Sequence, residues 1–445
     1  MSVPFGPFVL TLDDITQQIR RTFEQFTDPR QGKNTRYTLV DAGLSAFSVF
    51  FMQSPSFLEY QRSLEQALGR NNAQTLFGVH HIPSDNQIRH LLDSTAPSQV
   101  TPVFSYLFQG LYQAGVIDRY RAVNQTLLLA LDGTEYFSSR AIHGPNCSAR
   151  RHANGQVTYF HTVLTPVLVK PGVDKVIPLV PAYVQPQDGA EKQDCELNAA
   201  KRWLADWSLD YSPLNVTLLG DDLYCHEPFC RDVLNRGWGF IFVCKPESHA
   251  TVYEWLEFLQ RGGAVNTVVR RRWTGQRREF DTYRYAVSIP LRDGEDALLV
   301  NWCELTTTGE SGKVLYHNAF TTSLPLKDQN VAKVAEAGRS RWKIENENNN
   351  TLKTKGYHFE HNYGHGQQYL SSLLASLILL AFLVHTVLEW MADQYQLLRQ
   401  KLPSRKRLFS DIRTLTSYLC FESWEALMTF MLQSFYPVPS KPATG

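Results

Sequence analysis

Residues 126–133 read Thr126-Leu127-Leu128-Leu129-Ala130-Leu131-Asp132-Gly133, an apolar run that ends in a carboxylate. Residues 215–222 repeat this plan as Asn215-Val216-Thr217-Leu218-Leu219-Gly220-Asp221-Asp222. Short apolar runs bounded by turn residues are typical of buried strands, and an Asp just beyond such a strand projects from the edge of the sheet. Taken alone, an Asp at this position is most often a turn or cap residue.

A third segment, Arg341-Trp342-Lys343-Ile344-Glu345, changes the interpretation of the two Asp residues. Arg341 and Glu345 are four residues apart, so on a helix they share a face. In isolation they would be a surface ion pair, which contributes little to stability. A sheet and a helix can, however, gather all three carboxylates into one site for divalent metal ions. Such a site hydrolyses and transfers phosphodiesters.

Length and composition bound the protein class. The chain has 445 residues, enough for two or three domains. Apolar residues make up 43% and charged residues 20%, which excludes disorder as the main state. The formal net charge is only +1, so a nucleic-acid function must rest on local patches of charge.

Cysteine usage and apolar segments predict a cytoplasmic protein. Seven scattered cysteines do not form a disulfide framework, and Met1–Leu12 lacks the pattern of a secretory signal. Leu370–Leu388 has nineteen residues without Lys, Arg or carboxylate. Polar residues interrupt this segment, which predicts a buried core helix rather than a membrane span; they are Ser371, Ser372, Ser376, His385 and Thr386.

The first 115 residues predict an all-helical module. Acidic residues open a first helix at Asp13, and Ser84 or Asp85 can cap a later one. An apolar-rich segment and an amphipathic segment between them also predict helices: Leu39–Phe51 and Phe57–Leu68.

Residues 116–264 have an α/β pattern. Runs rich in β-branched and aromatic residues, bounded by Gly, Pro and Asn, predict strands. The expected strands are Leu127–Asp132, Val157–Leu168, Val176–Val184, Val216–Gly220 and Phe240–Cys244, and the expected helices are Cys195–Trp207 and Phe229–Leu234. Hairpin-type strands followed by alternating helices and strands predict a mixed sheet with flanking helices.

The sequence pattern after residue 264 predicts three further segments. Residues 265–326 read as a β-strand insertion with strands Asp281–Ile289, Ala297–Thr306 and Lys313–Thr322. The α/β domain then resumes over 327–400, with a helix at Val331–Asn350 before the long apolar helix. Residues 401–445 form a C-terminal helical region and tail with a basic cluster of Lys401, Arg405, Lys406 and Arg407.

On its carboxylate runs the chain resembles the DDE transposases of bacterial insertion sequences. It is most similar to the group with an RNase H-like catalytic domain and a β-strand insertion before the final Glu. The resemblance covers about residues 125–390. The matching segments are Leu131-Asp132-Gly133-Thr134, Leu219-Gly220-Asp221-Asp222-Leu223-Tyr224, and Phe320-Thr321-Thr322-Ser323-Leu324 leading into Arg341-Trp342-Lys343-Ile344-Glu345.

This resemblance implies both a reaction and a site. Asp132, Asp221 and Glu345 would be catalytic ligands of two Mg²⁺ ions, for which Mn²⁺ can substitute. Arg341 would orient a phosphate or a carboxylate, and Lys353 would be a further DNA contact. The implied reaction is cleavage at the ends of a mobile element and strand transfer into target DNA, by cut-and-paste.

The resemblance also implies partners. They are double-stranded DNA, as terminal inverted repeats and target, and a second copy of the chain in a synaptic dimer at the bacterial nucleoid. The N-terminal helical module would be a DNA-binding domain. Two alternatives remain: a domesticated RNase H-like nuclease that does not transpose, and a catalytically silent DNA-binding protein.

The chain departs from the family's pattern at two positions. Gly338 stands where the family has a Tyr three residues before the Arg. Leu352 stands where the family has a Lys seven residues after the Glu, with Lys353 one step later.

Two carboxylates also have neighbours that compete for their roles. Asp222 is an alternative to Asp221, which is favoured because its spacing to Tyr224 matches the family's Asp-x-x-Tyr. Glu347 is an alternative to Glu345, which is favoured by its spacing from Arg341.

Histidines and cysteines form two local groups, one of His143, Cys147, His152 and His161 and the other of Cys225, His226 and Cys230. Structural zinc sites usually have paired C-x₂₋₄-C and H-x₃₋₅-H elements. Neither group has this pairing, so core thiols and loop histidines are expected instead.

The insertion has two candidate DNA contacts. Arg270-Arg271-Arg272-Trp273, followed by Arg277 and Arg278, suits a DNA backbone, with a solvated strand face as the alternative. Trp302 is a candidate for stacking on an extruded base, with a core tryptophan as the alternative.

Overall fold

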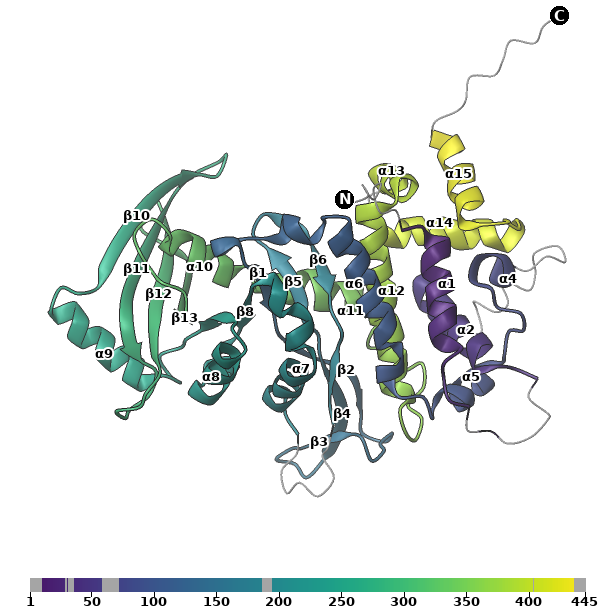
Figure 1. Ribbon diagram of the computed structural model, residues 1–445, viewed down its shortest axis with the longest axis horizontal. Helices are drawn as coiled ribbons and strands as arrows, with labels where there is room; N and C mark the ends of the chain where they lie inside the picture. The colour runs from purple at the N-terminus through teal and green to yellow at the C-terminus, as the bar shows by residue number, and fades with distance from the viewer. Residues whose placement is uncertain are drawn as a thin grey trace, which may run out of the picture.

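A large mixed sheet forms the centre of the computed structural model, which describes residues 10–28, 30, 36–57, 72–185, 194–402 and 404–435. Its nine strands are β1 (Leu127–Ala130), β5 (Val167–Lys170), β6 (Val173–Pro178), β8 (Val216–Gly220), β9 (Gly239–Val243), β10 (Asn266–Trp273), β11 (Arg278–Pro290), β12 (Leu299–Gly309) and β13 (Val314–Thr322). They are ordered β10-β11-β12-β13-β9-β8-β1-β5-β6 (Figure 1). The predicted α/β class with a mixed sheet is confirmed.

The middle of this sheet is parallel. Strand β1 pairs in parallel with β8, and β8 pairs in parallel with β9. Strands β5 and β6 continue the sheet on the other side of β1 in antiparallel fashion. Because β1 and β8 run in the same direction, the residues that follow them emerge at the same edge of the sheet.

A second sheet of four strands covers part of the core. Its strands are β2 (Gly133–Ser139), β3 (Ser148–Arg151), β4 (Val157–Leu164) and β7 (Ala182–Val184). The prediction of one strand over Val157–Leu168 was wrong, since β4 and β5 belong to different sheets. Pro166 separates them because it has no N–H for a ladder, and the N–H of Thr165 donates instead to the carbonyl of Asp132 at 3.0 Å.

The prediction of one strand over Val176–Val184 was wrong for a similar reason. Strand β6 ends at Pro178, and Pro181 precedes β7 in the other sheet. Two prolines within four residues interrupt ladder pairing.

Residues 265–326 are rich in strands, as predicted, and they extend the central sheet. Strand β13 pairs with β9, in the register Phe320↔Val243. Strands β12, β11 and β10 then follow in antiparallel order to the sheet edge. Helix α9 (Ala250–Arg261) precedes them and packs on β11, at the end of the molecule that is strand-rich in Figure 1.

Helices flank the sheets close to the predicted positions. They are α7 (Glu196–Tyr211), α8 (Glu227–Asn235), α10 (Val331–Arg339) and α11 (Asn350–Thr354). The predicted continuous helix over Val331–Asn350 is interrupted at Ser340, and Ile344–Asn349 is π-helical. Short 3₁₀ turns lie at Pro97–Val100, Ile117–Tyr120, Val123–Gln125, Ser212–Leu214 and Asp222–Tyr224.

Helices from both ends of the chain pack into one helical body, opposite the strand-rich end in Figure 1. The N-terminal members are α1 (Leu12–Phe23), α2 (Leu39–Phe51), α4 (Asn72–Phe77), α5 (Asp85–Leu92) and α6 (Thr101–Gln113). The C-terminal members are α12 (Leu370–Met391), α13 (Asp393–Lys401), α14 (Arg405–Tyr418) and α15 (Trp424–Phe435). The predicted helix at Phe57–Leu68 falls almost wholly outside the described residues.

Side-chain hydrogen bonds join the two groups of helices. Asn72 Nδ2 donates to the carbonyl oxygens of Thr416 and Leu419, both at 2.8 Å. The indole nitrogen of Trp424 donates to the carbonyl oxygen of Leu76 at 2.8 Å. Described residues of the predicted N-terminal module and of the C-terminal region are therefore in direct contact.

Helix α12 is the core helix of this body. Within the described residues it is the one helix long and apolar enough to cross a membrane, and 94% of its apolar window is buried inside the protein. It packs against α2, α6 and β6. The prediction of a buried core helix at this position is confirmed.

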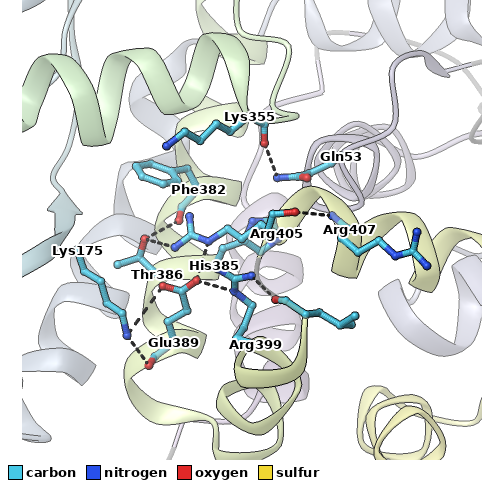
Figure 2. A network of polar contacts seen from close by, with 12 residues as sticks. Gln53, Lys175, Lys355, Phe382, His385, Thr386, Glu389, Arg399, Arg405 and Arg407 are labelled. Carbon is cyan, nitrogen blue, oxygen red and sulfur yellow. Dashed lines mark hydrogen bonds and ion pairs between the residues drawn. The ribbon is translucent and has the colours of Figure 1, made fainter. Parts of the chain in front are cut away.

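A buried charge network fixes the C-terminal helices to α12 (Figure 2). Glu389 Oε1 accepts from Arg399 Nε at 3.0 Å and from Arg405 Nε at 2.9 Å. Arg405 also donates to the hydroxyls of Tyr357, at 3.0 Å, and Thr386, at 3.3 Å. Burial opposes the charged form of Glu389, but Arg405 and Arg399 outweigh it and lower the pKa. Arg405, which the sequence places in a basic cluster, is thus an internal ion-pair partner.

Candidate functional site

Asp132 and Asp221 stand in register at the ends of neighbouring strands. The last paired residues of β1 and β8 are Ala130 and Leu219, and each Asp follows two residues later. The N–H of Leu131 still donates to the carbonyl oxygen of Leu219 at 2.9 Å, which carries the alignment past the strand end. The parallel ladder therefore brings together two carboxylates that are far apart in the sequence.

Asp132 lies in a strongly acidic environment. Burial is the largest cause that raises its pKa to about 7, and Glu196 is the next largest. Arg341 acts in the opposite direction, while Asp221 and Glu345 raise the pKa further. All three carboxylates predicted from the sequence, and the predicted arginine, are thus electrostatic neighbours at this site.

Three residues of the segment after α10 interact with Asp132, Arg341 and Glu345 through their charges and Asn349 through a hydrogen bond. Arg341, Glu345 and Asn349 are spaced four residues apart and so lie near one face of the helix. Asn349 Nδ2 donates to Asp132 Oδ2 at 2.9 Å, and Asn349 Oδ1 accepts from the Thr165 hydroxyl at 3.0 Å. Asn349 thus links the helix to the end of β1.

The segment that carries Glu345 has an unusual backbone. Ile344–Asn349 is π-helical and includes both Glu345 and Asn349. π-Helical turns are rare and occur frequently at functional sites. This backbone was not predicted, because the apolar spacing of the sequence indicates only a helix.

A fourth carboxylate, Glu196, lies at the start of α7 and was missed from the sequence. Its Oε1 accepts from the Tyr224 hydroxyl at 2.5 Å, and its Oε2 touches the place where a Cβ on Gly133 would be. Burial raises the pKa of Glu196, against the hydrogen bond from Tyr224, and Asp221 raises it further. An acid in the first turn of a helix is ordinary, so the sequence carries no signal that singles it out.

The two competing carboxylates lie in different surroundings. Asp222 Oδ1 accepts from the N–H of Lys245 at 2.7 Å and contacts His249 Nε2 at 3.3 Å, so it fixes the chain beyond β9. Glu347 lines a cavity that also contacts Lys175 and Arg405. Asp221 has a local partner as well, since its Oδ1 caps the following 3₁₀ turn by accepting from the N–H of Leu223 at 2.9 Å. The choice of Asp221 over Asp222 and of Glu345 over Glu347 therefore stays a prediction.

The departures from the family's pattern have local explanations. A Cβ on Gly338 would lie 2.9 Å from Ile241 Cγ2 and from two ring carbons of Phe320, so a tyrosine cannot fit without moving the helix. Leu352 is completely buried. Lys353 forms an ion pair with Glu360 at 2.8 Å and is partly exposed.

The arginine cluster lies on the exposed edge strand β10. Arg272 is paired with Glu279 at 2.5 Å and with Asp281 at 2.9 Å. Arg270 and Arg271 lie over the rings of Tyr283 and Phe280. Among the described residues, no carboxylate forms an ion pair with either of these two arginines or with the exposed Arg278, whereas Arg277 pairs with Glu279 at 2.9 Å.

Trp302 lies inside the strand-rich end of the molecule. It is 1% exposed, and its ring meets Tyr253 edge-on with centroids 6.2 Å apart. A base could reach it only after neighbouring side chains move. Its role in stacking on DNA stays a prediction.

The acidic site fits a divalent cation by its donor chemistry. Carboxylate oxygens are the ligands that Mg²⁺ prefers, and Asp132 is electrostatically coupled to three further carboxylates and to Arg341. Among the described residues, however, the groups with three ligand atoms all within 4.8 Å are two Cys/His groups, so the carboxylates are more widely spread. When ligands are shared between two ions, their oxygen atoms need not all be in contact with one another.

No protein-family model and no curated protein matches this chain. The candidate site is therefore defined by the sheet register, by Asn349, and by the electrostatic coupling of Asp132 to its neighbours.

Proposed function

We propose that the protein is a DNA transposase whose Asp132, Asp221 and Glu345 hold the divalent metal ions for phosphodiester cleavage and strand transfer. The observation that carries the proposal is the alignment of Asp132 with Asp221 at the ends of β1 and β8. The coupling of Asp132 to Glu345 and Arg341 supports it further. Its similarity in sequence order to the DDE transposases agrees with both observations.

The order of the central strands supports an RNase H-like core. Strands β6, β5 and β1 are an antiparallel meander, and β8 and β9 add in parallel beside β1. This order agrees with the RNase H-like core that we propose. The strand-rich segment joined to β9 then corresponds to the β-strand insertion that precedes the final Glu.

The protein's own side chains prepare the site in defined ways. Asn349 holds one oxygen of Asp132 and so fixes the direction of the other. Arg341 offsets part of the negative charge and can contact a phosphate. Bound Mg²⁺ would supply an activated water and stabilise the leaving oxygen. Glu196, held by Tyr224, adds to the negative charge that favours cation binding.

DNA would be gripped away from the carboxylates. Arg270 and Arg271 on the edge strand form no ion pair with a carboxylate among the described residues, which suits contacts to phosphates. A transposase must hold two element ends, so we propose that a homodimer is the active form.

The test uses the DNA that flanks the coding region, inspected for inverted repeats and cloned as labelled element ends. Incubation with a supercoiled target and Mg²⁺ should give cleavage at the ends and covalent joining of their 3′ ends to the target. Cleavage without joining would instead indicate a nuclease, and binding without cleavage a silent DNA-binding protein. Asp132→Asn serves as the control for contaminating nucleases.

A further inference from the structure

Three side chains from distant parts of the chain converge beside the four-stranded sheet. Cys147 lies in the loop before β3, His161 lies in β4, and His365 lies between α11 and α12. The Cys147 sulfur is 3.6 Å from His161 Nε2 and 3.2 Å from His365 Nε2, and the two nitrogens are 3.0 Å apart. His365 is 218 residues from Cys147 in the sequence.

These separations match the edges of a coordination tetrahedron. Zn–N bonds of about 2.0–2.1 Å and a Zn–S bond of about 2.3 Å place two nitrogens about 3.3 Å apart, and a nitrogen about 3.6 Å from the sulfur. The three observed distances lie within about 0.4 Å of those values. A single ion can therefore contact all three atoms with only small side-chain movement.

The surrounding hydrogen bonds orient the donor atoms toward a common point. His365 Nδ1 faces the carbonyl oxygen of Gly366 at 2.9 Å, and a carbonyl only accepts, so the proton is on Nδ1 and the Nε2 lone pair is free. The ring of His161 has a backbone hydrogen bond with Asn146. The N–H of Gly144 donates to the Cys147 sulfur at 3.3 Å and so fixes its position. Backbone partners of this kind fix the ligands in zinc sites.

The walls of the cluster exclude water from most sides. The rings of Tyr136 and Phe137 lie against His161, with centroids 5.7 and 5.4 Å from it. A small pocket lined by Asn146 and Gln368, among others, adjoins both histidines and holds about 10 Å³. That is roughly the room one water molecule needs. A fourth ligand from solvent can therefore complete the tetrahedron.

We propose that Cys147, His161 and His365 bind one Zn²⁺ ion, with water as the fourth ligand. One thiolate and two imidazoles are a donor set for zinc and not for the oxygen-seeking Mg²⁺. The ion would tie the four-stranded sheet to residues 355–369, which connect the Glu345 segment to α12. This site is separate from the carboxylates and does not depend on the proposed transposase activity.

The test measures metal binding by the full-length chain, purified without a histidine tag and stripped with a chelator. Loading with Zn²⁺ should give one ion per chain by elemental analysis. Loading with Co²⁺ should give the thiolate-to-cobalt absorption of a Cys-ligated tetrahedral site. Cys147→Ser and His365→Asn should each abolish this absorption and weaken Zn²⁺ binding by at least about a hundredfold.

Two control variants locate the site. His143→Asn changes an exposed histidine of the same loop, and Cys244→Ser changes the other Cys/His group, formed by Cys225, Cys244 and His249. Both should keep the cobalt absorption. Wild-type protein that binds no Zn²⁺ would overturn the proposal, as would absorption that persists in Cys147→Ser but disappears in Cys244→Ser.

A second measurement remains decisive if the ligand variants fail to fold. Stripped wild-type protein in excess Mg²⁺ should melt at a higher temperature once stoichiometric Zn²⁺ is added, because an ion that binds only the folded state stabilises it. The excess Mg²⁺ keeps any carboxylate site saturated. An unchanged melting temperature would overturn the proposal.

Discussion

Asp132 and Asp221 occupy equivalent positions on two adjacent parallel strands, each two residues beyond the paired residues Ala130 and Leu219. Their alignment is a property of the ladder, so it does not depend on the conformation of a loop. Asn349 also holds Asp132, through a hydrogen bond of 2.9 Å. The site is thus built on rigid elements, which favours precise placement of metal ligands.

Metal binding should strengthen as the pH rises through the pKa of Asp132, which burial and the neighbouring acids raise to about 7. A metal ligand must lose its proton, so below pH 7 the Mn²⁺ affinity should fall by up to about tenfold per pH unit. Titration of the chain with Mn²⁺ at pH 6 and pH 8, followed by electron paramagnetic resonance, measures the difference.

The same shift predicts how stability changes without metal. Because the pKa of Asp132 is higher in the folded state than its usual 3.8, the stability it contributes is fully present below about pH 4 and lost as the pH rises through 7. Mg²⁺ should therefore raise the melting temperature more at pH 8 than at pH 6. Asp132→Asn should lose this pH dependence, and an equal Mg²⁺ effect at both values in the wild type would contradict the assignment.

DNA affinity should depend less steeply on salt when Arg270 and Arg271 are both replaced by Gln. Each lost phosphate contact lowers the slope of log affinity against log salt by about 0.9. Arg261→Gln is the matched control, since Arg261 is an exposed arginine on α9 with an ion-pair partner, Glu257. Fluorescence anisotropy over a range of salt concentrations gives the slopes. Equal slopes in the wild type, the double variant and the control would mean that the cluster is a solvated strand face.

Glu389→Gln should destabilise the folded protein strongly. The change leaves the partly buried Arg399 and Arg405 without their shared carboxylate, and breaking a buried pair costs about 3–5 kcal/mol. Urea denaturation measures the free energy of unfolding, with the exposed Glu422→Gln as control.

The effect of Glu389→Gln should also depend on pH. The pKa of Glu389 is lowered, against burial, by Arg405 and Arg399, so its stabilisation is present above the usual value of 4.5 and is lost as the pH falls. The difference in the free energy of unfolding between variant and wild type should therefore become smaller as the pH falls. A difference in the free energy of unfolding that grows as the pH falls would mean that the ion pairs are not the source of the stability.

Much of the α/β core was predictable from local sequence. Apolar runs such as Val216–Gly220 indicate buried strands, and the structure forms β8 over those residues. Asp132 and Asp221 were identifiable because each directly follows such a run. The breaks at Pro166 and Pro178 were missed, because apolar residues continue on both sides of each proline and conceal the change of sheet.

The rest of the site depends on contacts between distant segments. Glu196 looks like any acid in the first turn of a helix until Tyr224 is seen to hold it. Asn349 lies in a polar run whose spacing gives no sign of its bond to Asp132. Cys147 and His161 lie close together in the sequence, but His365 joins His161 across 204 residues, so local spacing gives no sign of the third member of that cluster.

The central claim is that Asp132, Asp221 and Glu345 act together on phosphodiesters, whereas the adjacent Asp222 and Glu347 do not. The most direct measurement compares cleavage of labelled element-end DNA in Mg²⁺ by five variants, each with one of these carboxylates changed to its amide, beside a DNA-binding assay. Cleavage should be abolished in Asp132→Asn, Asp221→Asn and Glu345→Gln while DNA binding is retained, and should persist in Glu347→Gln and, where folded, in Asp222→Asn. Loss of cleavage in Asp222→Asn together with full activity in Asp221→Asn would contradict this assignment. So would loss of cleavage in Glu347→Gln together with full activity in Glu345→Gln.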